Sequence, residues 1–233
     1  MSKRGRPIGS KNKKTTSGAI IDEKTSAEVI NNKNKIVIGI DQSYKDTGIS
    51  ISYNCELKSA THCHTDNLPN NTEKRIELKN KLISVFDKAY SLKNKLNCSV
   101  QIIIERIRLQ SDGFINIDYI KGIGALNAMI VDLAYQYNFS VYSVDTRAWK
   151  SAIIGTSKPQ PNPYGIDPKK WPTIIWCIGF GFEKYIIDFN VGKKRKGIIH
   201  KNLRAYTYND NIADSIAISL YGFVDKPLLE LEH

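Results

Sequence analysis

The stretch Lys35-Ile-Val-Ile-Gly-Ile-Asp41 decides the fold, because it is an apolar run that ends on a carboxylate. Val100-Gln-Ile-Ile-Ile-Glu105 repeats this pattern. Short runs rich in β-branched residues predict strands that are buried in a sheet. Asp210 and Asp214 stand four apart at the start of a later apolar stretch, which puts both on one helical face. Acids from separate elements that meet in this way can hold divalent metal ions against a phosphodiester.

Around these runs the chain alternates between strand and helix patterns. Strands are predicted over 35–41, 47–54, 56–63, 99–105 and 139–144. Helices are predicted over 71–96, 114–137, 171–185 and 210–223, with a helix or helical turn at 146–154. Gly179 and Gly181 are expected to interrupt the helix at 171–185. Three antiparallel strands followed by alternating helix and strand predict an α/β fold, a mixed five-stranded sheet flanked by helices on both faces.

Composition bounds the organisation of the chain and its class of partner. The 233 residues carry a formal net charge of +11, which favours nucleic acid first and an acidic membrane surface second. Residues 1–34 are polar and basic, with too few apolar residues to order themselves, so they predict a disordered arm. One domain is expected over 35–225, and 231–233 resembles the start of a purification tag.

No apolar run approaches the ~20 residues that a membrane span needs, and the N-terminus has no signal-peptide core. The four cysteines form no CxxC pair, which favours reduced thiols, and His62-Cys63-His64 beside Cys55 fits no usual zinc spacing. We therefore expect an intracellular protein that acts in a host cytoplasm or nucleoid, in a viral replication compartment or in a mitochondrion.

Three motifs carry a resemblance to a known family. Ile38-Gly-Ile-Asp41-Gln-Ser-Tyr-Lys-Asp-Thr-Gly48 resembles the opening hairpin of the RuvC-like Holliday junction resolvases of the ribonuclease H superfamily. Ile102-Ile-Ile-Glu105-Arg is similar to the Ile-Glu motif of that family, and Asp210-Asn-Ile-Ala-Asp214-Ser-Ile-Ala to its final helix. The resemblance runs from residue 36 to 223, with the motifs in the family's order.

The resemblance implies a ribonuclease H-like fold and a metal-dependent crossover junction endodeoxyribonuclease of DNA recombination and repair. Asp41, Glu105, Asp210 and Asp214 would hold a pair of Mg²⁺ or Mn²⁺ ions, and Lys150 would lie near the scissile phosphate. The implied substrate is branched DNA, a four-way junction, cut by paired symmetric nicks that leave 5′-phosphate and 3′-hydroxyl ends. Paired nicks require two active sites and hence a homodimer, for which helix 114–137 is the candidate by analogy. No nucleotide cofactor is implied.

The final motif departs from the bacterial pattern. Bacterial members space the two acids three apart, whereas Asn211 stands at that position in this chain. The spacing of four is closer to the fungal mitochondrial branch and leaves open whether Asp210 is a direct ligand. We expect a viral, phage or mobile-element resolvase, in which Lys169 or Lys170 matches a second functional lysine of the family and contacts DNA.

Two other functions stay open at this point. A related nuclease of the same fold could act on flaps, replication intermediates or RNA. The opening motif also resembles the first phosphate loop of sugar kinases and actin-like ATPases, but 233 residues leave no room for the second subdomain of such ATP-binding proteins.

The remaining charged residues are interpreted more simply. Lys3-Arg-Gly-Arg-Pro7 resembles an AT-hook, whose Arg4 and Arg6 would enter the minor groove, and a general phosphate-binding arm is the alternative. The run Lys193–Lys196 is either a solvated loop or a DNA contact. Asp46, Asp145 and Asp188 are interpreted as turn or surface acids.

Overall fold

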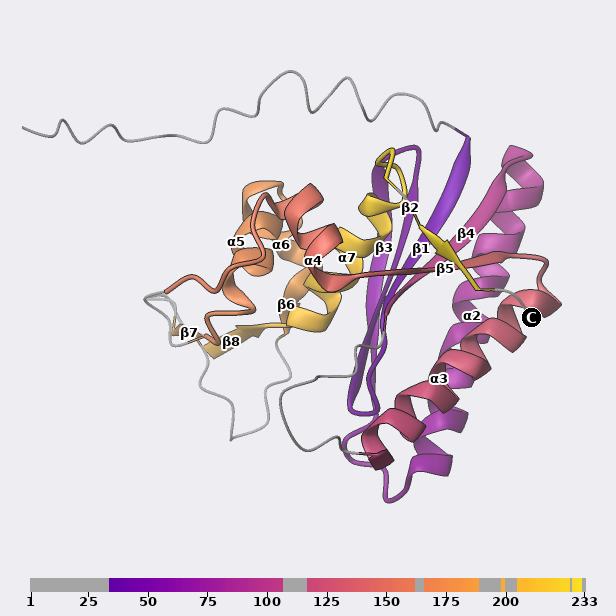
Figure 1. Cartoon of the computed structure of the whole chain (residues 1–233), viewed down its shortest axis with the longest axis horizontal. Coiled ribbons are helices and arrows are strands. Elements are labelled where there is room, and N and C mark those ends of the chain that lie inside the picture. The colour runs from indigo at the N-terminus through magenta and orange to yellow at the C-terminus, as the bar shows by residue number, and fades with distance from the viewer. Residues whose placement is uncertain are drawn as a thin grey trace, which may run out of the picture.

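The computed structural model describes residues 34–106, 117–161, 166–188, 198–199, 205–226 and 228–231. The predicted basic arm with Arg4 and Arg6, the run Lys193–Lys196 and the last two residues of the suspected tag lie outside the described residues. The centre of the molecule is a mixed six-stranded sheet with helices on both faces (Figure 1). The predicted class, an α/β fold with a mixed sheet flanked by helices on both faces, is confirmed.

The sheet has the strand order β3-β2-β1-β4-β5-β9. β1 (Lys35–Asp41), β2 (Asp46–Tyr53) and β3 (Glu56–His64) are antiparallel, whereas β4 (Ser99–Glu105) and β5 (Ser140–Val144) run parallel to β1. Five strands were predicted, and the sixth, β9 (Leu229–Glu230), pairs antiparallel with β5 and forms the edge of the sheet. A strand of two residues has no periodicity that a sequence pattern could show.

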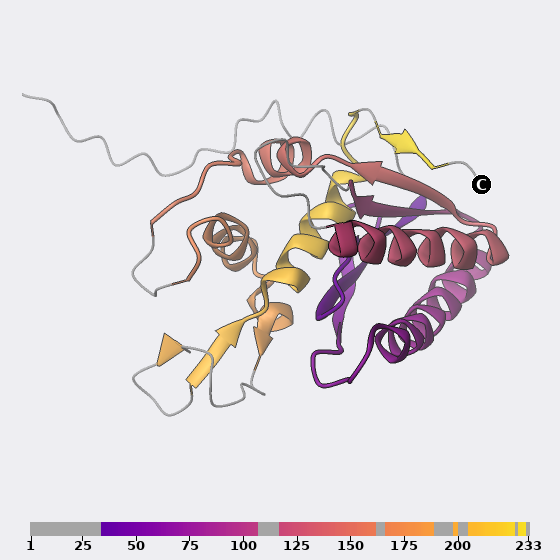
Figure 2. The ribbon, with the colours of Figure 1, turned by 60° about the horizontal axis from the view of Figure 1, so that its bottom comes forward.

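The helices form two layers. α2 (Asn71–Leu96) and α3 (Ile117–Gln136) cover one face of the sheet, and α7 (Asp210–Tyr221) lies across the other. α4 (Thr146–Trp149), a π-helical turn (Lys150–Ile154), α5 (Trp171–Gly179) and α6 (Glu183–Ile186) lie on the α7 side (Figures 1 and 2). No helix in the described part of the chain is long and apolar enough to cross a membrane.

The chain between residues 171 and 208 forms two short helices and a small sheet. The predicted interruption of the apolar segment 171–185 is confirmed, since α5 ends at Gly179 and the chain turns at Gly181, with a φ of 76°, before α6 begins. Between α6 and α7, β6 (Ile187–Asp188), β7 (Ile198–Ile199) and β8 (Ala205–Tyr208) form a second small sheet that was not predicted (Figure 2). β8 pairs antiparallel with both β6 and β7, and these two partners are only two residues long, so no alternation of apolar residues marks them.

α7 packs against the sheet at very short range. A Cβ atom added to Gly39 would lie 2.3 Å from the carbonyl oxygen of Ser215, and one added to Gly48 would lie 1.9 Å from that of Asn211. Only glycine at these positions leaves room for the helix backbone. The absence of a side chain at Gly48 therefore allows the first turn of α7 to lie directly against β2.

Serine hydroxyls fix α7 along the same stripe. Ser50 Oγ donates to the carbonyl of Ser215 at 2.7 Å, and Ser52 Oγ and Ser219 Oγ lie 2.8 Å apart. These hydroxyls are buried, so each bond satisfies a polar group that water cannot reach. Glycine and serine at every second residue of β2 thus dock the helix that carries two of the candidate acids.

Candidate active site

The four predicted acids converge where β1, β4 and α7 meet. Asp41 is the last residue of β1 and Glu105 the last of β4. Because these strands are parallel neighbours, with Ile40 opposite Ile104, both carboxylates lie at the same edge of the sheet. α7 begins at Asp210 and packs across β1 and β2, which brings Asp210 and Asp214 to that edge.

The charges of the acids act on one another. Burial raises the pKa of Asp41 well above its ordinary value, and the charges of Asp214, Glu105 and Asp210 raise it further against the opposing effect of Lys150. Burial also raises the pKa of Asp214 to about 6, although Lys150 and the Thr173 hydroxyl lower it. The neighbouring carboxylates therefore disfavour the ionised forms of Asp41 and Asp214.

Two of the three predicted site lysines lie against these acids. Lys150 Nζ is 3.8 Å from Asp214 Oδ2, and Lys170 Nζ forms an ion pair with Asp210 Oδ2. Burial lowers the pKa of Lys170, but its hydrogen bond to Asp210 and the charges of the nearby acids Asp210, Asp214 and Asp167 together raise it overall. Lys169 is exposed, and its backbone N–H donates to Asp167 in the turn before α5.

Two residues that the sequence did not single out hold Glu105. The Gln42 side chain donates to the Glu105 carbonyl at 2.5 Å and accepts from the Glu105 N–H at 3.2 Å. Trp149 Nε1 donates to Glu105 Oε1 at 3.0 Å. Gln42 directly follows Asp41, so its amide joins the ends of β1 and β4. Its position next to Asp41 was the only feature of the sequence that could have identified Gln42 as a site residue.

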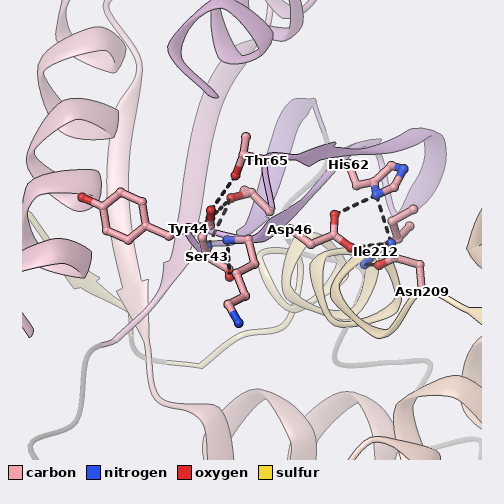
Figure 3. Close-up of polar contacts among 9 residues, drawn as sticks. Ser43, Tyr44, Asp46, His62, Thr65, Asn209 and Ile212 are labelled. Carbon is pink, nitrogen blue, oxygen red and sulfur yellow. Dashed lines mark hydrogen bonds and ion pairs between the residues drawn. The ribbon is translucent and has the colours of Figure 1, made fainter. Parts of the chain in front are cut away.

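The interpretation of Asp46 as a turn or surface acid is wrong. Asp46 is the first residue of β2 and is only 4% exposed. It bonds to His62 on β3 and to Asn209, the residue before α7 (Figure 3). Asp145 does behave as a turn acid, since it caps α4 by accepting from the Arg147 N–H. The side chain of Asp188 lies outside the described residues.

The carboxylates of the four acids are chemically suited to bind a divalent cation. Carboxylate oxygens are the ligands that Mg²⁺ and Mn²⁺ prefer, and Asp214 Oδ1 is buried without a hydrogen bond of ordinary geometry to a described residue. A cation would also relieve the repulsion that raises the pKa of Asp41. In the described ranges no three His, Cys, Asp or Glu side chains are already close enough to share a metal ion. The lysine pairs on Asp210 and Asp214 would have to rearrange for all four acids to bind metal.

The chain was compared with known proteins. No model of a protein family matches it, and no curated protein matches its sequence. Solved structures that resemble it include RuvC of Thermus thermophilus in complex with a Holliday junction substrate, at 12% identity and a TM-score of 0.49 over 81% of this chain and 93% of that chain. RuvC of the same organism in a second structure has 13% identity and a TM-score of 0.47 over the same shares of the chains. The yeast mitochondrial Holliday junction resolvase Ydc2 has 18% identity and a TM-score of 0.42, over 87% of this chain and 84% of that chain. In fold, the chain is similar to RuvC-like junction resolvases.

Proposed function

We propose that this protein is a RuvC-like, metal-dependent endonuclease that resolves four-way DNA junctions. The observation that carries the proposal is the convergence of Asp41, Glu105, Asp210 and Asp214, whose charges act on one another at one edge of the sheet. Such a group of acids destabilises the folded protein by itself, because buried like charges are costly. The binding of cations would offset this cost. The order of the three motifs along the chain gives independent support.

Each group of the site has a role in this proposal. Asp41, Glu105 and Asp214 hold the ions, and Asp210 contributes when its pair with Lys170 opens. When bound, a pair of divalent ions supplies an activated water and stabilises the leaving 3′ oxygen in an in-line displacement. Lys150, whose ammonium lies 3.8 Å from Asp214, neutralises charge on the scissile phosphate.

The choice of substrate rests on the motifs and on the charge of the chain. The net charge of +11 suits a polyanion, and the motif resemblance points to branched DNA. Paired symmetric nicks with 5′-phosphate and 3′-hydroxyl ends would need two sites, so we propose that a homodimer is the active form and that it acts on DNA inside a cell or organelle.

The proposal is tested by cleavage of a labelled four-way junction beside linear duplex, flap and single-stranded controls. Each substrate is incubated with Mg²⁺, with Mn²⁺ or with EDTA. We expect paired nicks on opposing strands of the junction alone, in the presence of either metal and not in EDTA. Faster cleavage of flaps or single strands would replace junction resolution by another nuclease activity, and inert protein with both metals would contradict the proposed site.

A further inference from the structure

A polar cluster lies beside the candidate active site, on the far side of the first turn of α7. Asp46 Oδ1 is 2.7 Å from His62 Nδ1, and Asp46 Oδ2 accepts from Asn209 Nδ2 at 2.9 Å (Figure 3). Asp46 and Asn209 are 4% and 2% exposed, whereas the His62 side chain keeps 33% of its exposure. The mechanism proposed above uses none of these three residues.

The protons in this cluster can be assigned from chemistry. Burial raises the pKa of Asp46, but the bond and charge of His62, the Asn209 amide and the charge of His64 together lower it. Asp46 is therefore an ionised acceptor, so His62 must carry its proton on Nδ1. Asn209 Nδ2 lies 3.0 Å from that Nδ1, and both nitrogens donate to one carboxylate.

Asn209 transmits this arrangement to α7. It is the N-cap of the helix, where its Oδ1 accepts from the Ile212 N–H at 2.9 Å and its carbonyl from the Ala213 N–H at 3.2 Å. Its own N–H donates to the carbonyl of Ile186 at 2.7 Å. Because Asp46 holds the NH₂ end of the amide, the oxygen end must face Ile212. The next residue along the chain is Asp210.

We propose that Asp46, His62 and Asn209 are positioning residues that fix the first turn of α7 and thereby the placement of Asp210 and Asp214. The carboxylate of Asp46 orients the cap, His62 orients that carboxylate, and the cap sets where the helix begins. The consequence for cleavage rests on the nuclease function proposed above, but the effect on α7 does not.

The first test measures amide hydrogen exchange in the metal-free protein, in the first turn of α7 and, as an internal reference, in β1. Asp46→Asn replaces one of the two acceptor oxygens by an NH₂ group, which then faces a donor, and Asn209→Asp puts a second carboxylate against Asp46. Each change should speed exchange at Ile212 and Ala213 by at least about fivefold, the usual cost of removing a cap, and leave β1 unchanged.

A swapped pair supplies the rescue. In the double variant D46N/N209D the amide at position 46 donates to the carboxylate at position 209, whose other oxygen caps Ile212, so every pair is restored. We expect its exchange rates at Ile212 and Ala213 to return to within about twofold of wild type. The exposed acid Asp66, changed to Asn, is the matched control. Single variants with normal rates, equal acceleration in α7 and β1, or a double variant no better than the singles would overturn the proposal.

Junction cleavage gives the second readout. The single variants should lower kcat at least about tenfold while the Kd for a four-way junction stays within twofold of wild type, because the cluster acts on the acids and not on DNA. Unchanged kcat in a variant with accelerated exchange would overturn the link to catalysis. If the wild-type protein cleaves no DNA, the nuclease proposal fails while the exchange result still decides the role of the cluster.

Discussion

At the scale of single residues, Asp41 is the acid whose ionised form is costly to the folded protein. Its pKa is raised by burial and by three acids that come from β4 and α7, and Lys150 opposes this only in part. An uncompensated group of this kind is expected to bind cations and to be costly to the empty protein. Function and stability should therefore respond in opposite directions when these acids are removed.

We expect Asp41→Asn to lower the rate of junction cleavage by more than about a hundredfold. Substitution of a residue that only supports a metal ligand already lowers activity by up to about that factor, and Asp41 is itself a proposed ligand. Junction binding should persist, since the substitution removes negative charge from a surface that meets DNA. Cleavage and gel-shift assays on the same preparation measure both effects. Asp225→Asn, which changes an exposed acid, is the control. Undiminished cleavage by the Asp41 variant would remove this residue from the site.

Asp214 allows a prediction about stability and pH. Its pKa is raised to about 6, above the ~3.9 of an unfolded Asp, so the folded state binds more protons between these values. The contribution of Asp214 to the free energy of unfolding therefore falls as pH rises through that window. We expect Asp214→Asn to raise the free energy of unfolding of the metal-free protein by about 1–3 kcal/mol at pH 7.5, with a smaller gain at pH 5.

Urea denaturation at the two pH values measures this difference. Mg²⁺ or Mn²⁺ should raise the Tm of the wild-type protein, because the ions bind only the folded site, and should raise that of the variant less. A variant that is less stable than wild type at pH 7.5 would show that Asp214 is held mainly by Lys150 and Thr173, and that its burial carries no net cost.

At the scale of elements, the contact between α7 and β2 determines whether the site assembles. Gly48→Ala would place a methyl group 1.9 Å from the carbonyl oxygen of Asn211, so α7 would have to move. We expect this change to lower the free energy of unfolding by about 3 kcal/mol or more, at the upper end of the cost of overpacking. Chemical denaturation measures it.

Gly124→Ala is the matched control for that substitution. Gly124 lies inside α3 with no atom within 4 Å of an added Cβ, so alanine there should stabilise the helix by about 0.5–1 kcal/mol. Equal effects at the two positions would mean that the close approach of α7 to Gly48 is not a real constraint.

The elements also show how far sequence reasoning reaches. The apolar runs that end at Asp41 and Glu105 predicted β1 and β4 to the residue, because burial on both faces leaves an unbroken pattern. The four acids could be chosen because Asp41 and Glu105 end such runs, whereas Asp210 and Asp214 share one helical face at the start of a later apolar stretch. Their partners could not, since the choice between Lys169 and Lys170 depends on where α5 begins and how it packs on α7.

Asp46 shows why the remaining features were missed. The interpretation as a turn or surface acid is wrong because Asp46, Gly48 and Ser50, at alternate positions of β2, face α7. Its hydrogen-bond partners stand 16 and 163 positions away in the chain. Local patterns describe burial along one element and contain no information on which distant donor will meet a buried acceptor.

At the scale of the whole molecule, the sheet separates two surfaces. α2 and α3 cover one face, and α7 and α5 lie on the other (Figure 2). α7 carries Asp210 and Asp214, and Lys170, at the start of α5, pairs with Asp210. The homodimer stays a prediction, with α3 as its candidate element. In the proposed function DNA would have to reach a site rich in acids, so the positive charge of the chain would act from elsewhere on the surface or from the basic N-terminal residues.

The N-terminal residues offer the test of that arrangement. Six Lys and Arg residues fall within the first fourteen positions, and no acid appears before Asp22. We expect deletion of residues 1–30 to weaken junction binding and to reduce the slope of log K against log salt by several units, at about 0.9 for each DNA phosphate that the segment neutralises. Binding titrations between about 50 and 200 mM salt measure the slope. An unchanged slope would show that this segment binds no phosphates.

Two double variants separate minor-groove recognition from general charge. Arg4→Ala with Arg6→Ala and Lys13→Ala with Lys14→Ala remove the same charge, but only the first pair lies in the AT-hook-like motif. If Arg4 and Arg6 enter the minor groove, the first pair should abolish a preference for junctions with AT-rich arms over GC-rich arms, since a narrow AT-rich groove attracts arginine. The second pair should weaken binding to both junctions alike. Equal losses of affinity in the two variants would reduce the motif to an ordinary phosphate-binding segment, and the selectivity of the protein for branched DNA would then have to come from the folded domain.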